Sequence, residues 1–197
     1  MAPLETRAES DSTTGEADLA RLDASISFLP VRIALLTVSD SRGAADDRSG
    51  DLLAARVEAA GHELAARAIV RDDPDAIEAR LREWVAAPEI QVVITTGGTG
   101  ITGRDLTPEA MERVCDKILP GFGELFRSLS FPSIGTSAMQ SRAIGGVARE
   151  TYLFALPGST GACKDGWDKI LRWQLDIRHR PCNLVELMPR LGERCPG

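Results

Sequence analysis

Glycine and threonine residues with phosphate-binding chemistry gather in one stretch of the sequence. Three glycines fall within the run Thr96-Gly97-Gly98-Thr99-Gly100. A glycine-rich backbone turns sharply and lets a ligand approach its amides closely, and successive free N–H groups form a concavity that attracts anions. The run is therefore predicted to bind an anionic group such as a phosphate, with Thr96, Gly97, Gly98, Thr99 and Gly100 as contacts.

Two carboxylates predicted to lie near this loop are candidates for holding a divalent cation. Mg²⁺ prefers oxygen ligands and bridges protein carboxylates to substrate phosphates, so Asp72 and Asp105 are the candidate metal ligands and catalytic residues. Each has a structural alternative, because Asp72 could belong to the cap of the next helix and Asp105 could pair with Arg104 or cap a helix near Thr107. Arg142 could steer an anion or form a structural ion pair.

Two nucleotide motifs resemble this stretch only formally. Gly98-x-Gly100-x-x-Gly103 matches the dinucleotide fingerprint, but that motif needs its third glycine in the first helical turn and an acid at the end of the next strand. The sequence near Lys117, where that strand would fall, is predicted to be helical. The Gly-Lys-Ser/Thr triplet of a nucleotide-hydrolase loop does not occur. A tight turn without a ligand leaves the threonines and the Arg104-Asp105 pair unexplained.

Alternating strand and helix patterns position these loops. Short apolar runs predict buried strands at 31–38, 91–95 and 151–156, and partial alternation predicts an edge strand at 62–70. Helices are predicted at 50–60 with Ser49 as cap, 74–86 with Asp73 as cap, from Thr107 as cap, and at 122–129, 137–143 and 162–175. The order predicts an α/β fold, a three-layer sandwich with a mostly parallel central sheet.

In such a sheet the carboxyl ends of the strands meet at one edge, so the loops that follow them converge. This adds Ser39 and Asp40, and Pro157, Gly158 and Ser159, to the candidate ligand-binding residues. A hydrolase triad is not favoured, because neither histidine of the chain falls in these loops. His62 is predicted to be a surface residue.

Composition limits the partners. The chain has 197 residues and a net charge of −6 without a basic stripe, which argues against nucleic acid. It has no apolar run long enough for a membrane span and no apolar signal core, and its four cysteines are scattered, so a cytoplasmic location is expected. Residues 1–29 are predicted to be a flexible tail and 30–197 a single domain.

Seven blocks in collinear order between Val31 and Leu187 together resemble the MoaB/Mog family of molybdenum cofactor biosynthesis, in particular its MoaB branch. The blocks are TVSDSRG (37–43), TTGGTG (95–100), RDLTPE (104–109), PGFGELFR (120–127), IGTSAMQSRA (134–143), LPGST (156–160) and RPCN (180–183).

The resemblance implies that residues 30–197 bind molybdopterin and assemble as a homotrimer or a dimer of trimers. It implies adenylylation of molybdopterin with Mg-ATP and release of pyrophosphate. The pterin-phosphate loops then correspond to Thr96–Gly100 and Pro157–Ser159, and the two family aspartates to Asp72 and Asp105. The MoaB-type loop at Ser159-Thr160 leaves an alternative open, a non-catalytic molybdopterin carrier or scaffold.

Overall fold

A computed structural model describes residues 21–41 and 43–193 and has a six-stranded central sheet. The strands lie in the order β3 (Glu63–Val70), β2 (Arg32–Val38), β4 (Val92–Thr96), β7 (Thr151–Leu156), β6 (Ile144–Ala148) and β5 (Lys117–Leu119). The first four strands are parallel, whereas β6 and β5 are antiparallel to their neighbours. The predicted α/β fold with a mostly parallel sheet is confirmed, and β3 is an edge strand as expected.

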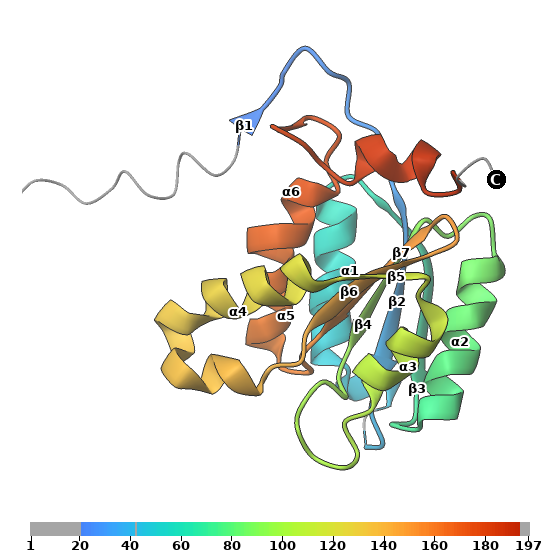
Figure 1. Ribbon diagram of the computed structural model, residues 1–197, viewed down its shortest axis with the longest axis vertical. Helices are drawn as coiled ribbons and strands as arrows, with labels where there is room; N and C mark the ends of the chain where they lie inside the picture. The colour runs from blue at the N-terminus through green and yellow to red at the C-terminus, as the bar shows by residue number, and fades with distance from the viewer. Residues whose placement is uncertain (1–20, 42, 194–197) are drawn as a thin grey trace, which may run out of the picture.

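Helices cover both faces of this sheet and complete the three layers (Figure 1). One face carries α2 (Pro74–Ala86) and α3 (Thr107–Val114); the other carries α1 (Arg48–Ala59), α4 (Pro120–Ile134) and α5 (Thr160–Gly166). Side chains alternate along each strand, so Ile33 and Leu35 of β2 pack on the α1 side while Ala34 and Leu36 pack on the α2 side. No described helix is long and apolar enough to cross a membrane.

Short elements join these helices and strands. They are η1 (Ala44–Asp46), the 3₁₀ helix η2 (Gly135–Gln140), the π-helix η3 (Trp167–Leu171), α6 (Arg172–Gln174), β8 (His179–Arg180) and η4 (Val185–Arg190). The loop that follows β4 lies at the bottom of the molecule in Figure 1, and the C-terminal segment lies at the top. The carboxyl edge of the sheet is therefore remote from the C-terminal segment.

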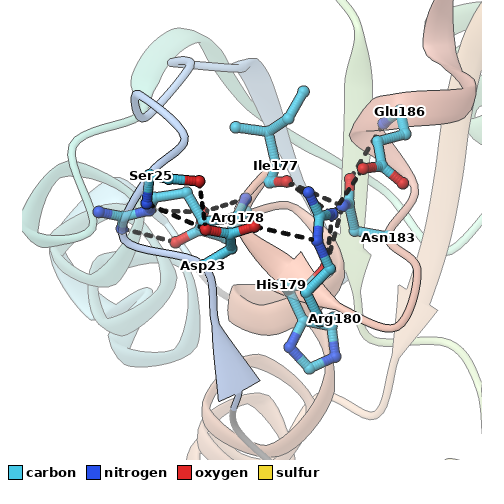
Figure 2. Close-up of polar contacts among 9 residues, drawn as sticks. Asp23, Ser25, Ile177, Arg178, His179, Arg180, Asn183 and Glu186 are labelled. Atoms are coloured by element: carbon cyan, nitrogen blue, oxygen red, sulfur yellow. Dashed lines mark hydrogen bonds and ion pairs between the residues drawn. The ribbon is translucent and has the colours of Figure 1, made fainter.

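An N-terminal strap, residues 21–30, lies at that upper end against the C-terminal segment. Its strand β1 (Arg21–Leu22) pairs antiparallel with β8. Asp23 binds Arg180 at 3.7 Å, and Arg180 binds Glu186 at 2.6 Å (Figure 2). Asn183 Nδ2 donates to the carbonyls of Ile177 and His179. Residues 1–20 of the predicted tail lie outside the described residues.

The strap explains one wrong prediction. His62, expected at the surface, is 6% exposed, and its Nδ1 accepts a hydrogen bond from the Val31 amide at 3.2 Å. Its ring packs between Phe28 of the strap and Trp167, with centroid distances of 5.2 and 6.1 Å. The local sequence does not show this cover, because Phe28 comes from 34 positions earlier in the chain.

The start of α1 was also predicted wrongly. Asp47, not Ser49, is the cap, and its side chain accepts from the Gly50 amide at 3.0 Å. Asp47 is fully buried and also binds Thr37 Oγ1 and Arg67 at 2.7 Å each. Burial opposes the charge, but these hydrogen bonds outweigh it and hold the pKa of Asp47 below its ordinary value.

Three boundaries near the site also differ from expectation. Lys117 lies in strand β5 rather than in a helix, because β5 pairs with β6 after α3 ends at Val114. α4 continues past Leu129 and through Pro132 to Ile134. The helix expected at 137–143 is the earlier η2, Gly135–Gln140.

Candidate functional site

The predicted loops share one cavity of about 790 Å³ at the carboxyl edge of the sheet. Its size is typical of a small-molecule site. Every candidate site residue except Thr96 lines it: Ser39, Asp40, Asp72, Gly97, Gly98, Thr99, Gly100, Asp105, Pro157, Gly158 and Ser159. The convergence expected from a parallel sheet is therefore present.

The glycine loop has a conformation that side chains would block. Gly97 and Gly98 have φ angles of 104° and 62°, values that favour glycine. A Cβ on Gly97 would lie 2.2 Å from the Val38 carbonyl oxygen, and one on Gly98 would lie 2.3 Å from Thr107 Oγ1. Thr107 is the first residue of α3 rather than its cap, and its Oγ1 donates to the Gly97 carbonyl at 2.9 Å.

Thr96 does not line the cavity; its buried side chain links the loop after β4 to the loop after β7. It is 2% exposed, and its Oγ1 donates to the Pro157 carbonyl at 3.1 Å. The loops also touch directly, because a Cβ on Gly158 would lie 3.2 Å from the Gly97 Cα. Ser49 Oγ donates to the Gly158 carbonyl at 2.9 Å. The loops after β4 and β7 thus form one connected wall.

Asp72 and Asp105 lie in the same cavity but in different electrostatic states. Asp72 Oδ1 is buried and has no hydrogen-bond partner among the described residues. Burial and then the negative charges of Asp105 and Asp40 raise the pKa of Asp72 above its ordinary value. Burial also acts on Asp105, but hydrogen bonds from Thr102 Oγ1 at 2.6 Å, the Thr102 amide at 2.9 Å and the Gly100 amide lower its pKa.

The structural alternatives for these aspartates can now be decided. Arg104 binds Asp40 rather than Asp105, and Asp105 closes the turn at Thr102 rather than capping α3. Asp73, and not Asp72, caps α2, through the amides of Asp75 and Ala76. Asp72 Oδ1 is thus left for the cavity, while the Leu106 backbone donates a hydrogen bond to the same carboxyl group.

The lining of this cavity carries negative charge and backbone amides. Four aspartates line it, Asp40, Asp72, Asp105 and Asp165, and none of the described lining residues is a lysine or an arginine. A phosphate would therefore depend on loop amides and on a cation to offset the carboxylates.

The lining carboxylates do not form a complete metal site by themselves. Within the described ranges no group of three His, Cys, Asp or Glu side chains could hold a metal alone. Mg²⁺ usually takes one or two protein carboxylates together with substrate phosphates and water. A cation would bind Asp72 Oδ1, which has no hydrogen-bond partner among the described residues. It would also offset the negative charges of Asp105 and Asp40, which disfavour ionisation of Asp72.

Arg142 has a structural role at the edge of this site. Its guanidinium donates to the carbonyls of Gly100, at 2.6 Å, and Asp105, and it binds Glu109 at 2.5 Å. Its amide also donates to the Thr99 carbonyl at 3.0 Å. Arg142 thus fastens the glycine loop from outside the cavity, as the ion-pair alternative expected.

Sequence reasoning missed the second wall of the cavity. That wall comes from α4, η2 and α5 and comprises Phe126, Ser130, Ser133, Ile134, Gln140, Ser141, Gly161, Ala162 and Asp165. Ser133 and Ile134 escaped notice because the helix that begins at residue 122 was predicted to end at residue 129, and Phe126 because it lies inside that predicted helix rather than in a loop. The extra turn of α4 places them at the site.

A second cavity of about 1020 Å³ lies at the other end of the strands. Its lining includes Arg32, Gln91, Lys117 and Thr151, near the amino ends of four strands, and residues of η4. Ligands of open α/β sheets bind beyond the carboxyl ends of the strands. The smaller cavity also contains both glycine loops, so it is the candidate site.

Comparison with known proteins agrees with this geometry. The domain family described as "Probable molybdopterin binding domain" matches residues 34–177, which include both glycine loops. The chain belongs to the MoaB/Mog family. It is 51% identical over 159 residues to molybdenum cofactor biosynthesis protein B of Escherichia coli (strain K12), covering 81% of this chain and 94% of that protein. The protein of the same name from Bacillus subtilis (strain 168) is 43% identical over 142 residues, covering 72% and 84%.

Solved structures of this family share the fold. A crystal structure of molybdenum cofactor biosynthesis protein B superposes with a TM-score of 0.76 at 38% identity, covering 84% of this chain and 98% of that one. The tungsten cofactor synthesizing protein MoaB from Pyrococcus furiosus superposes with a TM-score of 0.70 at 32% identity, covering 83% and 98%. The expected family resemblance is confirmed.

Proposed function

We propose that this MoaB/Mog family member acts in molybdenum cofactor biosynthesis by binding molybdopterin in the cavity at the carboxyl edge and adenylylating it with Mg-ATP. The terminal phosphate of molybdopterin would lie on the Gly97–Gly100 loop, beside Gly158. The Gly97 amide already donates to the Leu156 carbonyl at 3.1 Å and the Gly100 amide to Asp105, so the amides of Gly98 and Thr99 would hold it. Asp72 and Asp105 would hold Mg²⁺ together with phosphate oxygens.

The proposed reaction is a nucleotidyl transfer. A terminal phosphate oxygen of molybdopterin attacks the α-phosphorus of ATP, a new P–O bond forms, and the bond to the bridging oxygen breaks so that pyrophosphate leaves. Mg²⁺, when bound, offsets negative charge on the phosphates. The glycine loop, which is fastened by Thr107 and Arg142, would position the molybdopterin phosphate for this attack.

One observation supports this proposal more than the others. Asp72 Oδ1 is buried beside Gly98 without a hydrogen-bond partner among the described residues, and a Cβ on Gly98 would lie 3.0 Å from it. An oxygen in that state is costly unless a ligand satisfies it. A metal-bound phosphate on the glycine loop would bring the cation that this oxygen lacks.

The test is to incubate the purified protein with molybdopterin and Mg-ATP and to measure adenylylated pterin and pyrophosphate. Asp72→Asn and Asp105→Asn should each reduce turnover by at least about a hundredfold, because each removes charge that positions the reacting phosphates. Asp75→Asn is the matched control, since Asp75 lies on α2 with a side chain 92% exposed, and its turnover should equal that of the wild type. Equal loss in all three variants would contradict the assignment.

A carrier or scaffold without nucleotide chemistry is the second candidate function. The sequence Leu156-Pro157-Gly158-Ser159-Thr160 resembles the MoaB branch, and the matched curated relatives are named for that protein. Molybdopterin binding that ATP does not alter, with no pyrophosphate released, would establish the carrier. Release of pyrophosphate only in the presence of molybdopterin would exclude it.

We also propose that the protein assembles as a homotrimer or a dimer of trimers in the cytoplasm. Large apolar side chains are exposed on α4 and η2, with Leu125 at 46%, Phe131 at 56% and Met139 at 79%, and such clusters often mark subunit contacts. Sedimentation analysis that gives only the monomer at micromolar concentration would contradict the proposed assembly.

A further inference from the structure

The cavity has a region that phosphate binding does not use. Its three other aspartates follow strands β2, β3 and β4, whereas Asp165 lies on α5 beside a different kind of wall. That wall contains Phe126 and Ile134 from α4 and Ala162 from α5. Ala162 and Asp165 are three positions apart, and therefore lie on the same face of α5.

An apolar wall with one carboxylate beside it is chemically suited to a flat heterocycle. The ring faces are covered by the aliphatic and aromatic side chains, and the carboxylate fixes the ring edge through directed hydrogen bonds. Both helices contribute to the same part of the cavity, because α4 and α5 are in contact. The glycine loops carry no comparable apolar surface for a ring.

Asp165 keeps acceptor capacity for a ligand. Its Oδ1 meets Lys169 Nζ at 3.0 Å, and its side chain is 29% exposed. A carboxylate has two oxygens and about four lone-pair sites, so one ammonium contact leaves room for a bidentate partner.

We infer that Asp165 is a specificity-determining residue that binds the 2-amino-4-oxo edge of the pterin ring, with the ring against Phe126, Ile134 and Ala162. This rests on the proposed placement of molybdopterin in the cavity. The pterin edge presents two adjacent donors, the 2-amino group and the neighbouring ring N–H, which match the two oxygens of a carboxylate. Adenine presents one donor and one acceptor there and is a poorer match.

The test compares two ring systems that differ at this edge. Pterin carries the 2-amino group, whereas lumazine carries an oxo group that would face the carboxylate with a lone pair. The wild type should bind pterin about tenfold or more tightly than lumazine, because hydrogen bonds to a charged acceptor are the strong ones. Asp165→Asn should remove or invert that ratio, since its amide can donate to the oxo group.

Two controls separate recognition from structure. Lys169→Met removes the ion pair but keeps the carboxylate, so its pterin-to-lumazine ratio should remain that of the wild type. The affinity of Asp165→Asn for ATP should stay within about twofold of the wild type, because the nucleotide is not expected at this edge. Thermal unfolding of each variant establishes that the protein is folded.

Three results would overturn this inference. The first is equal affinity of the wild type for pterin and lumazine. The second is no detectable binding of either compound. The third is an unchanged pterin-to-lumazine ratio in Asp165→Asn, whether or not that variant also loses affinity for ATP. None of these measurements involves adenylyl transfer. If Asp165→Asn changes the pterin-to-lumazine ratio but the wild type does not transfer adenylyl groups, ring recognition by Asp165 is supported and the proposed reaction is refuted. If the wild type transfers adenylyl groups but the ratio is unchanged in Asp165→Asn, the reaction is supported and ring recognition by Asp165 is refuted.

Discussion

Gly98→Ala should destabilise the protein because position 98 has no room for a side chain. The residue has a φ of 62°, and a Cβ would lie 2.3 Å from Thr107 Oγ1. A non-glycine residue in the left-handed region costs about 1–2 kcal/mol. Displacing Thr107 would break its buried 2.9 Å hydrogen bond to the Gly97 carbonyl, which costs about 1–3 kcal/mol when a group is left unsatisfied.

The free energy of unfolding should therefore fall by about 2–5 kcal/mol, and Tm by about 4–20 °C for a chain of this size. Gly103→Ala is a matched control from the same stretch, because a Cβ there meets nothing within 4 Å. Its unfolding free energy should stay within about 0.5 kcal/mol of the wild type. Urea titrations of the three proteins measure the difference. Equal stability of the two variants would refute the assigned loop conformation.

Three further predictions concern titratable side chains. Asp72→Asn should raise the Tm of the ligand-free protein while abolishing transfer. The raised pKa of the Asp72 carboxyl means that its ionisation destabilises the folded state; this destabilisation is absent below the unfolded pKa and complete above the folded pKa. A lower Tm of the variant by differential scanning calorimetry would contradict this. Asp47→Asn should lower the free energy of unfolding by about 1–3 kcal/mol, because it weakens the hydrogen bonds of a fully buried group, whereas Arg67 is 30% exposed and keeps its ion pair with Asp51 at 2.7 Å. The lowered pKa of Asp47 means that its stabilisation is present above the unfolded pKa and lost as pH falls through the folded pKa. Unfolding titrations from pH 7 to 3 measure both effects. Burial lowers the pKa of His62 against an opposing effect of Asp176. The buried neutral ring therefore contributes stability that is complete above the unfolded pKa and is lost as pH falls through the folded pKa. His62→Gln should remove this dependence of the unfolding free energy on pH, and an unchanged dependence would refute the reasoning.

The main strands of the fold could be predicted from local sequence patterns, because long-range contacts do not change those patterns' local structure. The strands at 31–38, 91–95 and 151–156 are continuous apolar runs, and the observed β2, β4 and β7 lie within one residue of them at each end. Asp73 followed by Pro74 marked the start of α2 correctly, since both signals act within one helical turn.

The errors occur where distant residues decide the local structure. Lys117–Leu119 is a strand because β6 supplies its partner, and no pattern within three residues reveals that. Asp47 displaces Ser49 as the cap of α1 because Arg67, twenty positions away, neutralises it in the interior. The first wall of the site was predictable, since parallel strands bring their following loops together. The second wall was not, because it depends on where α4 and α5 end in space.

A crystal structure of the protein with molybdopterin tests the location of the site most directly. The terminal phosphate should lie on the Gly97–Gly100 loop, within hydrogen-bond distance of the Gly98 and Thr99 amides and beside Asp72. Molybdopterin in the cavity at the amino ends of the strands, against Arg32 and Lys117, would contradict it.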